Sequence, residues 1–304
     1  MCPEYRTAVR AVGTGTGEDA LDASLIVACL AWGVFVGAVF STIGAAGGIL
    51  TSFGLITLFG VMDPNSVKPM TQLIVLATVV TFIPGYLRRS ALVLPLGLML
   101  GAGGLVGAYV GSTVSSLYLS DMKTFRPLFG VLTLLIAAEI IWKLYRQNRV
   151  ALKNGSHEKE DPDATVSGTK FSMQGVAFGY GDTQYSVPIW SPVLAGALIS
   201  MTASIFGVGG GFLLVPYMSA VLGMPMHIIP ATAAIAIFMS LVVSISNFLA
   251  LGAPLQLDLL ITLGVGTVAG AIAGPQINKM MKNSWLQAIM GVIVTGIGLK
   301  YVLF

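Results

Sequence analysis

Charged side chains are scarce in this sequence. Asp, Glu, Lys and Arg make up 10% of its 304 residues, whereas a soluble domain carries roughly 25%. Three long runs contain none of them: 23–62, 90–120 and 183–257. A helix needs about 20 apolar residues to cross a bilayer, so the last run, which is 75 residues long, must cross more than once. The sequence therefore predicts an all-α polytopic membrane protein embedded in a lipid bilayer.

Residues that perform catalysis or bind metals are also few. The chain has 2 cysteines and 2 histidines, which excludes a disulfide framework and a Cys/His metal cluster. It contains no P-loop and no nucleophile beside a plausible base. A net charge of +3 is too small to attract nucleic acid. We expect no enzyme, no cofactor, no metal and no nucleic-acid partner.

Polar residues are concentrated in two stretches, which divide the chain. Residues 1–23 form a polar tail of mixed charge, unlike a cleaved signal. Residues 146–189 are the only long polar segment between hydrophobic ones, and we expect an exposed, partly disordered loop there. The first membrane repeat is then 24–145 and the second is 190–304. Most lysines and arginines fall on the side of the loop, which predicts that the loop is cytoplasmic.

Two hydrophobic segments, 49–60 and 212–222, are too short to cross alone. Each follows a glycine cluster, and the simplest interpretation joins it to the preceding segment as one broken helix. This predicts about eight transmembrane helices in a 4+4 repeat, with parallel halves and both termini in the cytoplasm. If the short segments cross instead, there are ten spans and the halves are inverted. With either count Lys68, just before the segment 69–87, is assigned to the non-cytoplasmic side.

The two halves of the chain repeat one another. At an offset of 163 residues, Ser41 matches Ser204, and the glycines of the first cluster match those of the second. After a two-residue gap the offset becomes 161, where Thr71 matches Thr232. Further matches follow in the same order along both halves. We interpret this as an internal duplication, which is a recurrent design of secondary transporters.

The glycine clusters are the strongest candidates for a binding site. They read Ser41-Thr-Ile-Gly-Ala-Ala-Gly-Gly48 and Ser204-Ile-Phe-Gly-Val-Gly-Gly-Gly211. Each glycine disfavours a helix by about 1 kcal/mol, and unwound backbone inside a membrane is tolerated only beside protein or a water-filled cavity. The segment starting at Phe212 would then present free N–H groups to an anion. The alternative is close helix packing through small residues. The candidate substrate-binding glycines are Gly44, Gly47, Gly48, Gly207, Gly209, Gly210 and Gly211.

A second motif follows each glycine cluster. Pro69-Met-Thr71-Gln72 is matched by Pro230-Ala-Thr232-Ala. Thr71, Gln72 and Thr232 would add neutral hydrogen-bonding groups beside the glycine loops. The alternative is ordinary chemistry of a helix N-terminus, where proline suits the first turn. Ser and Thr in membrane helices usually bond their own backbone. The weaker candidates are therefore Ser41, Thr42, Ser204, Ser244, Ser246 and Asn247.

These motifs resemble those of the TauE/SafE family, the sulfite exporter and toluene-sulfonate uptake permease group. The resemblance covers about 24–304. It rests on Gly207-Val-Gly-Gly-Gly-Phe-Leu-Leu-Val-Pro216, on Pro230-Ala-Thr232, and on the degenerate copy Gly44-Ala-Ala-Gly-Gly48. The first copy departs from the pattern, because Ala46 stands where the second has Gly209. The resemblance implies transport of small sulfur-containing or organic anions across the bacterial cytoplasmic membrane.

The sequence thus leads to a hypothesis about function. We expect a secondary transporter of the inner membrane that moves a small anion, such as sulfite or an organosulfonate, by alternating access. Two other functions stay open: a passive channel for a small solute, and a membrane receptor or assembly factor that acts through 146–189. The sequence leaves open the substrate, the direction of transport and the coupling ion. It is compatible with a homo-oligomer.

Overall fold

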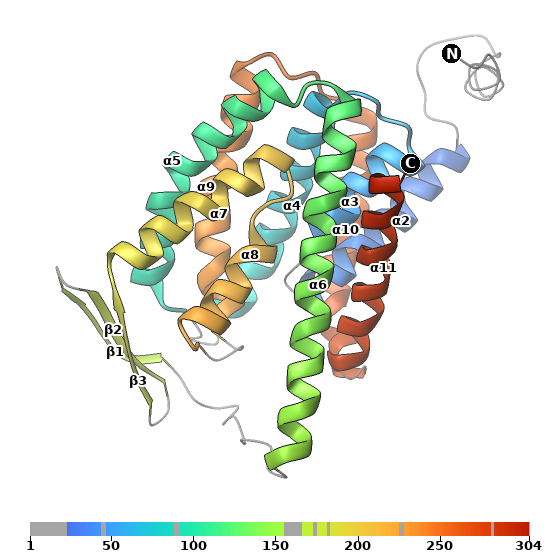
Figure 1. Ribbon diagram of the computed structural model, residues 1–304. Coiled ribbons are helices and arrows are strands. Elements are labelled where there is room, and N and C mark those ends of the chain that lie inside the picture. Colours follow the sequence, from blue (N-terminus) through green and yellow to red (C-terminus); the bar gives the residue numbers. More distant parts are fainter. Residues whose placement is uncertain are drawn as a thin grey trace, which may run out of the picture.

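The computed structural model is a bundle of helices with one small sheet (Figure 1). The residues it describes are 23–43, 47–87, 92–154, 166–172, 175–180, 183–224, 228–280 and 283–303. The helices before the sheet are α2 (Ala23–Ile43), α3 (Gly47–Phe53), the π-helix η1 (Gly54–Leu58), α4 (Pro64–Leu87), α5 (Leu94–Tyr118) and α6 (Met122–Asn154). Those after it are α7 (Trp190–Phe206), α8 (Gly211–Pro216), the π-helix η2 (Tyr217–Val221), α9 (Ile229–Ala250), α10 (Leu257–Met280) and α11 (Asn283–Leu303).

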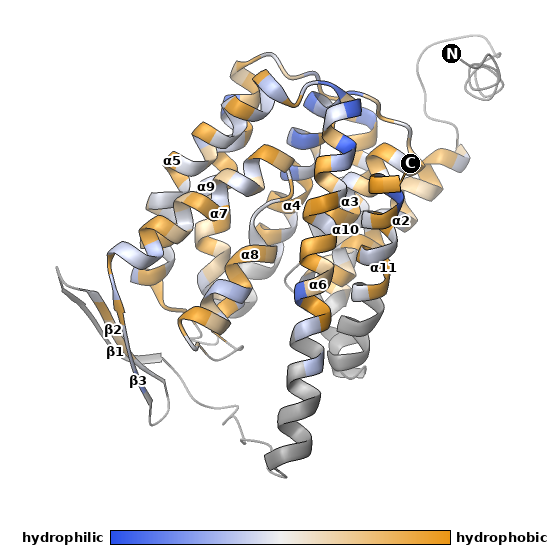
Figure 2. Cartoon of the chain, in the orientation of Figure 1, coloured by the Kyte–Doolittle hydropathy of each residue, from blue (hydrophilic) through white to orange (hydrophobic). Residues whose placement is uncertain are grey.

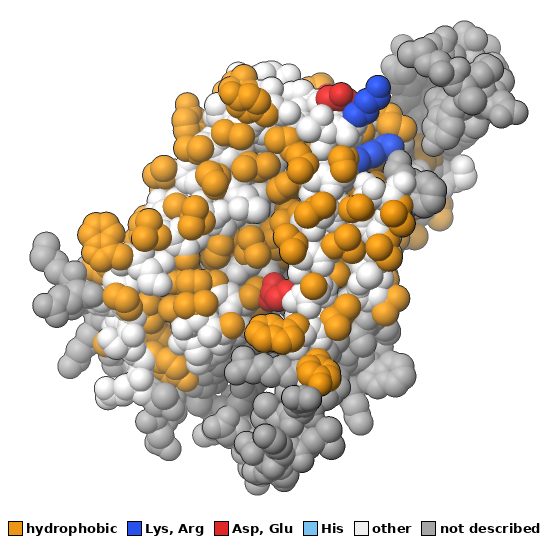
Figure 3. Space-filling view, in the orientation of Figure 1, with side chains coloured by type: hydrophobic (Ala, Val, Ile, Leu, Met, Phe, Trp, Pro, Cys, Tyr) orange, Lys and Arg blue, Asp and Glu red, His pale blue; other side chains and the backbone are white. Residues whose placement is uncertain are grey.

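The surface of the bundle has the character of a protein in lipid. Large apolar side chains are exposed on the helices, for example Val106, Leu135 and Val292, which are 65%, 65% and 74% exposed. Apolar side chains cover most of the visible face, and the coloured charges lie mainly at its upper end (Figures 2 and 3). Water would not stabilise such a surface. Among the described residues, four helical stretches are long and apolar enough to cross a membrane: Ala23–Ser41, Leu94–Tyr118, Met122–Trp142 and Ile229–Ala250. The prediction of a multi-pass α-helical membrane protein is confirmed.

The duplication is visible in the order of the elements. Each half has a long helix, a short helix that continues as a π-helix, and then three long helices. The two π-helices, Gly54–Leu58 and Tyr217–Val221, stand at the 163-residue offset that relates the glycine clusters. Each is followed by a glycine with positive φ, Gly60 at 68° and Gly223 at 64°. Local backbone geometry thus repeats where the sequence repeats.

The short helices fold back along the helices before them. The indole Nε1 of Trp32 donates to the Leu50 carbonyl over 3.2 Å, and the same ring lies against Gly54. In a continuous helix, residues 32 and 54 would be about 33 Å apart. In the second half, the hydroxyls of Ser191 and Tyr217 lie 2.7 Å apart. The prediction of one broken span is therefore wrong, because each short helix packs back along the helix before it.

Helix ends that are distant in sequence gather at one end of the bundle. Lys68, near the start of α4, lies within hydrogen-bonding distance of the Leu119 carbonyl at the end of α5. Its ammonium group also lies over the rings of Phe125, near the start of α6, and Phe248, near the end of α9. The ring of Phe206, at the end of α7, is 6.4 Å from that of Phe125. Consequently α7 and α9 run toward this end and α4 runs away from it.

The first helix runs in the opposite direction to its repeat counterpart α7. Trp32, in the first half of α2, packs on Phe53 at 6.1 Å, and Phe53 packs at the same distance on Tyr301, near the end of α11. Tyr301 in turn contacts Phe129 of α6. Since α2 begins where α7 ends, the halves are inverted, as five segments per half predict, and not parallel. The start of α2 and the end of α11 lie at the opposite end of the bundle from the strands (Figure 1).

The halves are interleaved, because each starts with a helix that packs on the other half. α2 packs along α10, and α7 packs along α5. A Cβ atom at Gly37 would overlap the carbonyl oxygen of Thr267, and one at Gly107 would overlap that of Ala197. Close packing through small residues therefore explains these glycines, which lie outside the two clusters.

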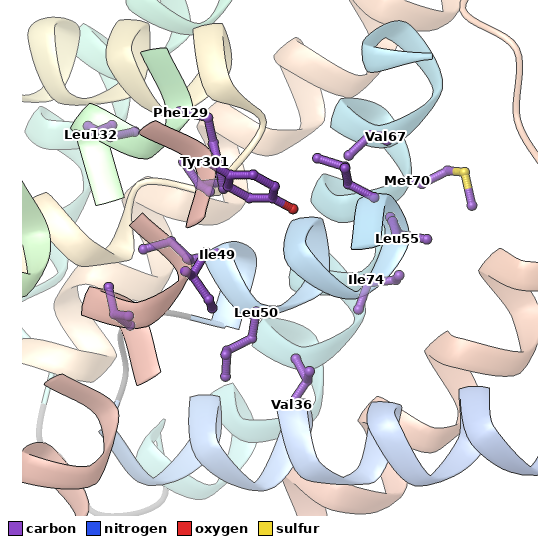
Figure 4. Packing of buried hydrophobic residues seen from close by; sticks show 14 of the residues in the cluster. Val36, Ile49, Leu50, Leu55, Val67, Met70, Ile74, Phe129, Leu132 and Tyr301 are labelled. Atoms are coloured by element: carbon purple, nitrogen blue, oxygen red, sulfur yellow. The ribbon is translucent and has the colours of Figure 1, made fainter. Parts of the chain in front are cut away.

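The first short helix lies inside the core. Ile49 and Leu50 of α3 sit among side chains of α2, α4 and α11, including Val36, Ile74 and Tyr301 (Figure 4). Because residues on all sides of α3 are buried, this helix has no face that must be polar to contact water. This burial holds the Gly47–Gly48 end of α3 inside the bundle.

A sheet occupies much of the segment between the halves. β1 (Val166–Ser172), β2 (Gly175–Tyr180) and β3 (Thr183–Pro188) are antiparallel and lie in that order. Val176, Phe178 and Val187 are buried, and the ring of Phe178 stacks on that of Tyr185 at 5.2 Å. The expectation of an exposed loop at 146–189 is wrong for these strands, and α6 extends to Asn154. Residues 155–165 of that segment lie outside the described residues.

Candidate functional site

The two glycine breaks meet inside the bundle. Gly48, in the first turn of α3, lies directly against Val208, in the break between α7 and α8. A Cβ atom at Gly48 would overlap the carbonyl oxygen of Val208. Both residues are buried. Gly44 lies outside the described residues, so the first break is known here from Gly47 and Gly48.

The second break depends on backbone angles that favour glycine. Gly207, Gly209 and Gly210 have φ angles of 74°, 83° and 69°, in the left-handed region where a Cβ atom is strained. The N–H of Val208 closes the end of α7 on the carbonyl of Ala203. These three glycines therefore serve a turn, whereas Gly48 serves a close approach.

The expected row of free N–H groups at the start of α8 is shorter than predicted. The N–H groups of Leu213 and Leu214 bond to the Gly210 carbonyl, and that of Gly211 bonds to Gly209. Within the described part of the chain, the N–H groups of Gly209 and Gly210 form no backbone hydrogen bond. The break thus offers few backbone donors, and side chains must contribute to any ligand site.

Gln72 is the outstanding side chain beside this break. It is 0% exposed, and among the described residues neither its Nε2 nor its Oε1 has a hydrogen-bond partner. It lines a cavity of about 10 Å³ together with Gly209, Gly210 and Ser204. A buried amide without partners destabilises a fold by roughly 1–3 kcal/mol. A buried amide without partners beside a cavity is a candidate for binding a ligand or water.

Hydroxyl groups complete the cavity. Ser200 of α7 and Ser240 of α9 line it, with their Oγ atoms 2.8 Å apart. Ser244, one turn beyond Ser240, is buried, and its Oγ has no partner among the described residues. The sequence interpretation ranked Ser204 and Ser244 low and omitted the other two. Their signal is the spacing, since serines four apart lie on one helix face.

The structure separates two residues that the sequence placed with Gln72. The hydroxyl of Thr71 lies 3.1 Å from that of Ser52 and so ties α4 to α3. Thr232 donates to the Ile228 carbonyl and accepts from the N–H of Val93. Thr232 therefore joins the starts of α9 and α5 at the other end of the bundle. Neither residue lines the cavity, while Gln72, Gly209 and Gly210 do.

The sequence interpretation missed a buried cation. Lys68 is 0% exposed, although the sequence suggests a side chain just outside an apolar segment. Its Nζ donates to the Oγ of Ser115 over 2.7 Å and to the Leu119 carbonyl over 3.0 Å. The Cα of Lys68 would lie 2.6 Å from a Cβ atom at Gly207. The second break therefore rests on Lys68.

Comparison with known proteins assigns the family. The family described as Sulfite exporter TauE/SafE matches residues 29–301. The chain belongs to this family. It is 26% identical over 278 residues to the "Probable membrane transporter protein YunE" of Bacillus subtilis (strain 168), with 89% of this chain and 94% of that protein covered. The search of solved structures finds no match. The predicted family and membership of a membrane transporter group are confirmed.

The residues that line the cavity are better suited to reversible binding than to making or breaking covalent bonds. Its lining consists of an amide, hydroxyls and glycine backbone. Within the described ranges, no three His, Cys, Asp or Glu side chains are grouped to hold a metal ion. Neutral donors bind an oxyanion without a buried opposite charge, so the anion can leave again. A TauE/SafE protein with such a site is suited to hold a small polar solute briefly.

Proposed function

We propose that this protein is a secondary transporter that moves a small oxyanion, sulfite or an organosulfonate, across the bacterial cytoplasmic membrane. Membership of the sulfite exporter TauE/SafE family and similarity to a probable membrane transporter support the transport function. In this proposal the binding site is the cavity that Gln72 lines together with Gly209 and Gly210 of the second break. The observation that carries this assignment is the buried Gln72 amide, which has no partner among the described residues.

Alternating access follows from the size of the cavity and from the inverted halves. A volume of about 10 Å³ accommodates roughly one water molecule, so an anion of several heavy atoms enters only after helices move apart. Inverted repeats transport by exchanging equivalent conformations of the two halves around a central site. Here α2 packs on α10 as α7 packs on α5. Rocking of the interleaved halves would open the site to one side and then to the other.

Counterflow of labelled sulfite tests this proposal. Purified protein in liposomes loaded with unlabelled sulfite should accumulate external labelled sulfite, and uptake should saturate. Uptake that neither saturates nor shows counterflow would support a passive channel instead. If sulfite does not move, the same assay with an aryl or alkyl sulfonate tests the second substrate class.

Gln72→Leu tests the site itself. The variant keeps the volume of the side chain but removes its donor and acceptor, and we expect counterflow to fall to the level of empty liposomes. Gln256→Leu is the matched control, because Gln256 is exposed in the turn between α9 and α10. Counterflow at the wild-type rate in Gln72→Leu would overturn the site assignment.

A further inference from the structure

Lys68 has a demanding environment for a positive charge. All of its side chain is buried at the end of the bundle where α5, α7 and α9 finish. The rings of Phe125 and Phe248 lie 5.6 and 5.8 Å from its Nζ. A cation buried among membrane helices is expensive and is usually functional.

The partners of the Lys68 ammonium group are all neutral. Nζ donates to Ser115 Oγ over 2.7 Å, to the Ser115 carbonyl over 3.2 Å, to the Leu119 carbonyl over 3.0 Å, and to Asn65 Oδ1 over 3.3 Å. Asp63, five residues earlier, accepts from the N–H of Asn65 and the hydroxyl of Ser66. No acceptor in this set is a carboxylate. Neutral groups therefore satisfy the hydrogen bonds of Nζ, while the Asp63 carboxylate acts on the charge only through space.

The fold does not require lysine at this position. The repeat offset of 161 pairs Lys68 with Ile229, each directly before the matched prolines. Ile229 is 0% exposed in the first turn of α9. An apolar side chain therefore builds the equivalent turn in the second half. The lysine is an addition that only the first half carries, which favours a role beyond helix packing.

The position of Lys68 connects it to the candidate site. It lies one helical turn before Gln72 on α4, a rise of about 6 Å. Gly207, the first glycine of the second break, packs on its Cα, Cβ and Cγ. Gly209 of the same break packs on Val75, one turn beyond Gln72. The break therefore follows α4 from Lys68 past Gln72, and Lys68 stands between the cavity and the nearer end of the bundle.

We propose that Lys68 is a second anion-binding position on the transport path, where its ammonium group exchanges neutral acceptors for an oxygen of the passing oxyanion. This inference rests on the proposed transport function. A charged acceptor forms a stronger hydrogen bond to an ammonium group than a carbonyl or hydroxyl does. The neutral partners then hold Lys68 while the path is empty and release it when an anion arrives.

The same residue would give the path its preference for anions. Gln72 and the serines around it are neutral and would accept polar solutes of either sign. The buried positive charge of Lys68, one helical turn from Gln72, raises the local concentration of anions and excludes cations. Selectivity thus depends on the lysine, while binding at the cavity depends on the amide and hydroxyls.

Three variants test the role of Lys68 in sulfite counterflow. Lys68→Gln keeps a hydrogen-bond donor without the charge, and its KM for sulfite should rise about ten- to a hundredfold, the effect of one charge-assisted hydrogen bond. Lys68→Arg keeps the charge and should restore most of this affinity. Lys123→Gln, at an exposed lysine near the same end of the bundle, should leave KM unchanged. A folded Lys68→Gln protein with wild-type KM would overturn the inference while leaving the proposed function intact.

A measurement on the wild-type protein covers the case in which Lys68→Gln fails to fold. If Lys68 lies on the path, Nζ becomes reachable from solution when the helices move apart during transport. Acylation of Lys68 by an amine-reactive reagent, read by mass spectrometry, should then be slower when sulfite is present, because the bound anion covers Nζ. Labelling of Lys123 should not change. Equal acylation of Lys68 with and without sulfite would contradict the inference. If the wild-type protein moves no sulfite or sulfonate at all, the proposed function fails first.

Discussion

At the residue scale, two amide side chains in this protein, one half-buried and one fully buried, have opposite surroundings. Asn247 of α9 donates to the hydroxyls of Ser112 and Thr113 of α5, over 2.8 and 2.9 Å. Gln72 is equally polar but has no partner among the described residues. The first amide fastens two helices together. The second has no such partner to offset its burial, and the proposed function assigns it to the binding of the substrate.

This contrast gives a prediction about stability. Gln72→Leu should leave the melting temperature unchanged or raise it, because it removes a desolvation penalty of roughly 1–3 kcal/mol. Asn247→Leu should lower the melting temperature, since it leaves two hydroxyls without their donor. Thermal unfolding in detergent, followed by intrinsic fluorescence, measures both. A Gln72→Leu protein that is as destabilised as Asn247→Leu would assign Gln72 a structural role.

A glycine pair tests the contact between the breaks. Gly48→Ala should destabilise the protein by several kcal/mol, because the new Cβ would overlap the backbone carbonyl of Val208, which cannot move cheaply. Gly264→Ala is the control, since a Cβ at this position in α10 meets nothing within 4 Å. It should stabilise the helix by up to about 1 kcal/mol. Equal unfolding temperatures for the two variants would rule out the close contact.

At the scale of elements, each half contains a hairpin whose second arm is too short to resemble a span. Residues 47–52 of α3 and the first three residues of η1 are buried, and α8 with η2 returns to the start of α7. The π-helices end both arms at equivalent positions. A π-helix widens the turn and commonly marks a functional segment. Gly48 lies in the first turn of one returning arm and Val208 lies just before the other, so the alignment of the arms determines whether these two residues meet.

The hydrogen bond between Ser191 and Tyr217 tests the second hairpin. Tyr217→Phe removes the hydroxyl that joins η2 to the start of α7 and should destabilise the protein by about 0.5–1.5 kcal/mol. Tyr109→Phe is the control, because Tyr109 is exposed on α5. Thermal unfolding of both variants measures the difference. No shift in either variant would mean that this bond does not hold the arm in place.

At the scale of the whole molecule, the hairpins decide the topology. With five alternating segments per half, the sheet lies at the opposite end from the start of α2. The excess of Lys and Arg near the sheet favours a cytoplasmic position for it. The orientation is thus a prediction that depends on the folded arrangement as much as on the charges.

Single-cysteine labelling tests this topology in intact cells. In a Cys2→Ser, Cys29→Ser background, Gln256→Cys in the α9–α10 turn should react with an impermeant maleimide added outside. Ser186→Cys, on an exposed position of β3, should react only after the membrane is opened. Both residues reacting from the same side would contradict the inverted arrangement of the halves.

The sequence alone predicted the features that depend on local composition. Long runs without charge are incompatible with water, so the membrane class follows from the charge count. The duplication is legible because equivalent positions need the same residues, as Gly60 and Gly223 do for positive φ. The glycine clusters mark helix breaks for the same local reason. A strand signal was also present, because apolar residues alternate along 176–187, but the polar composition of 146–189 masked it.

Only the tertiary structure decided what depends on contacts between distant residues. Nothing local in the hydrophobic segment 49–60 shows whether it continues the span that α2 begins or folds back along α2. The hydrogen bond from Trp32 to the Leu50 carbonyl shows that it folds back. Gln72 and Thr71 are neighbours in sequence, yet one faces a cavity and the other faces Ser52. Lys68 appears interfacial until α5 and α6 cover it. Composition determines which solvent surrounds the chain, whereas packing determines which polar groups are left without partners.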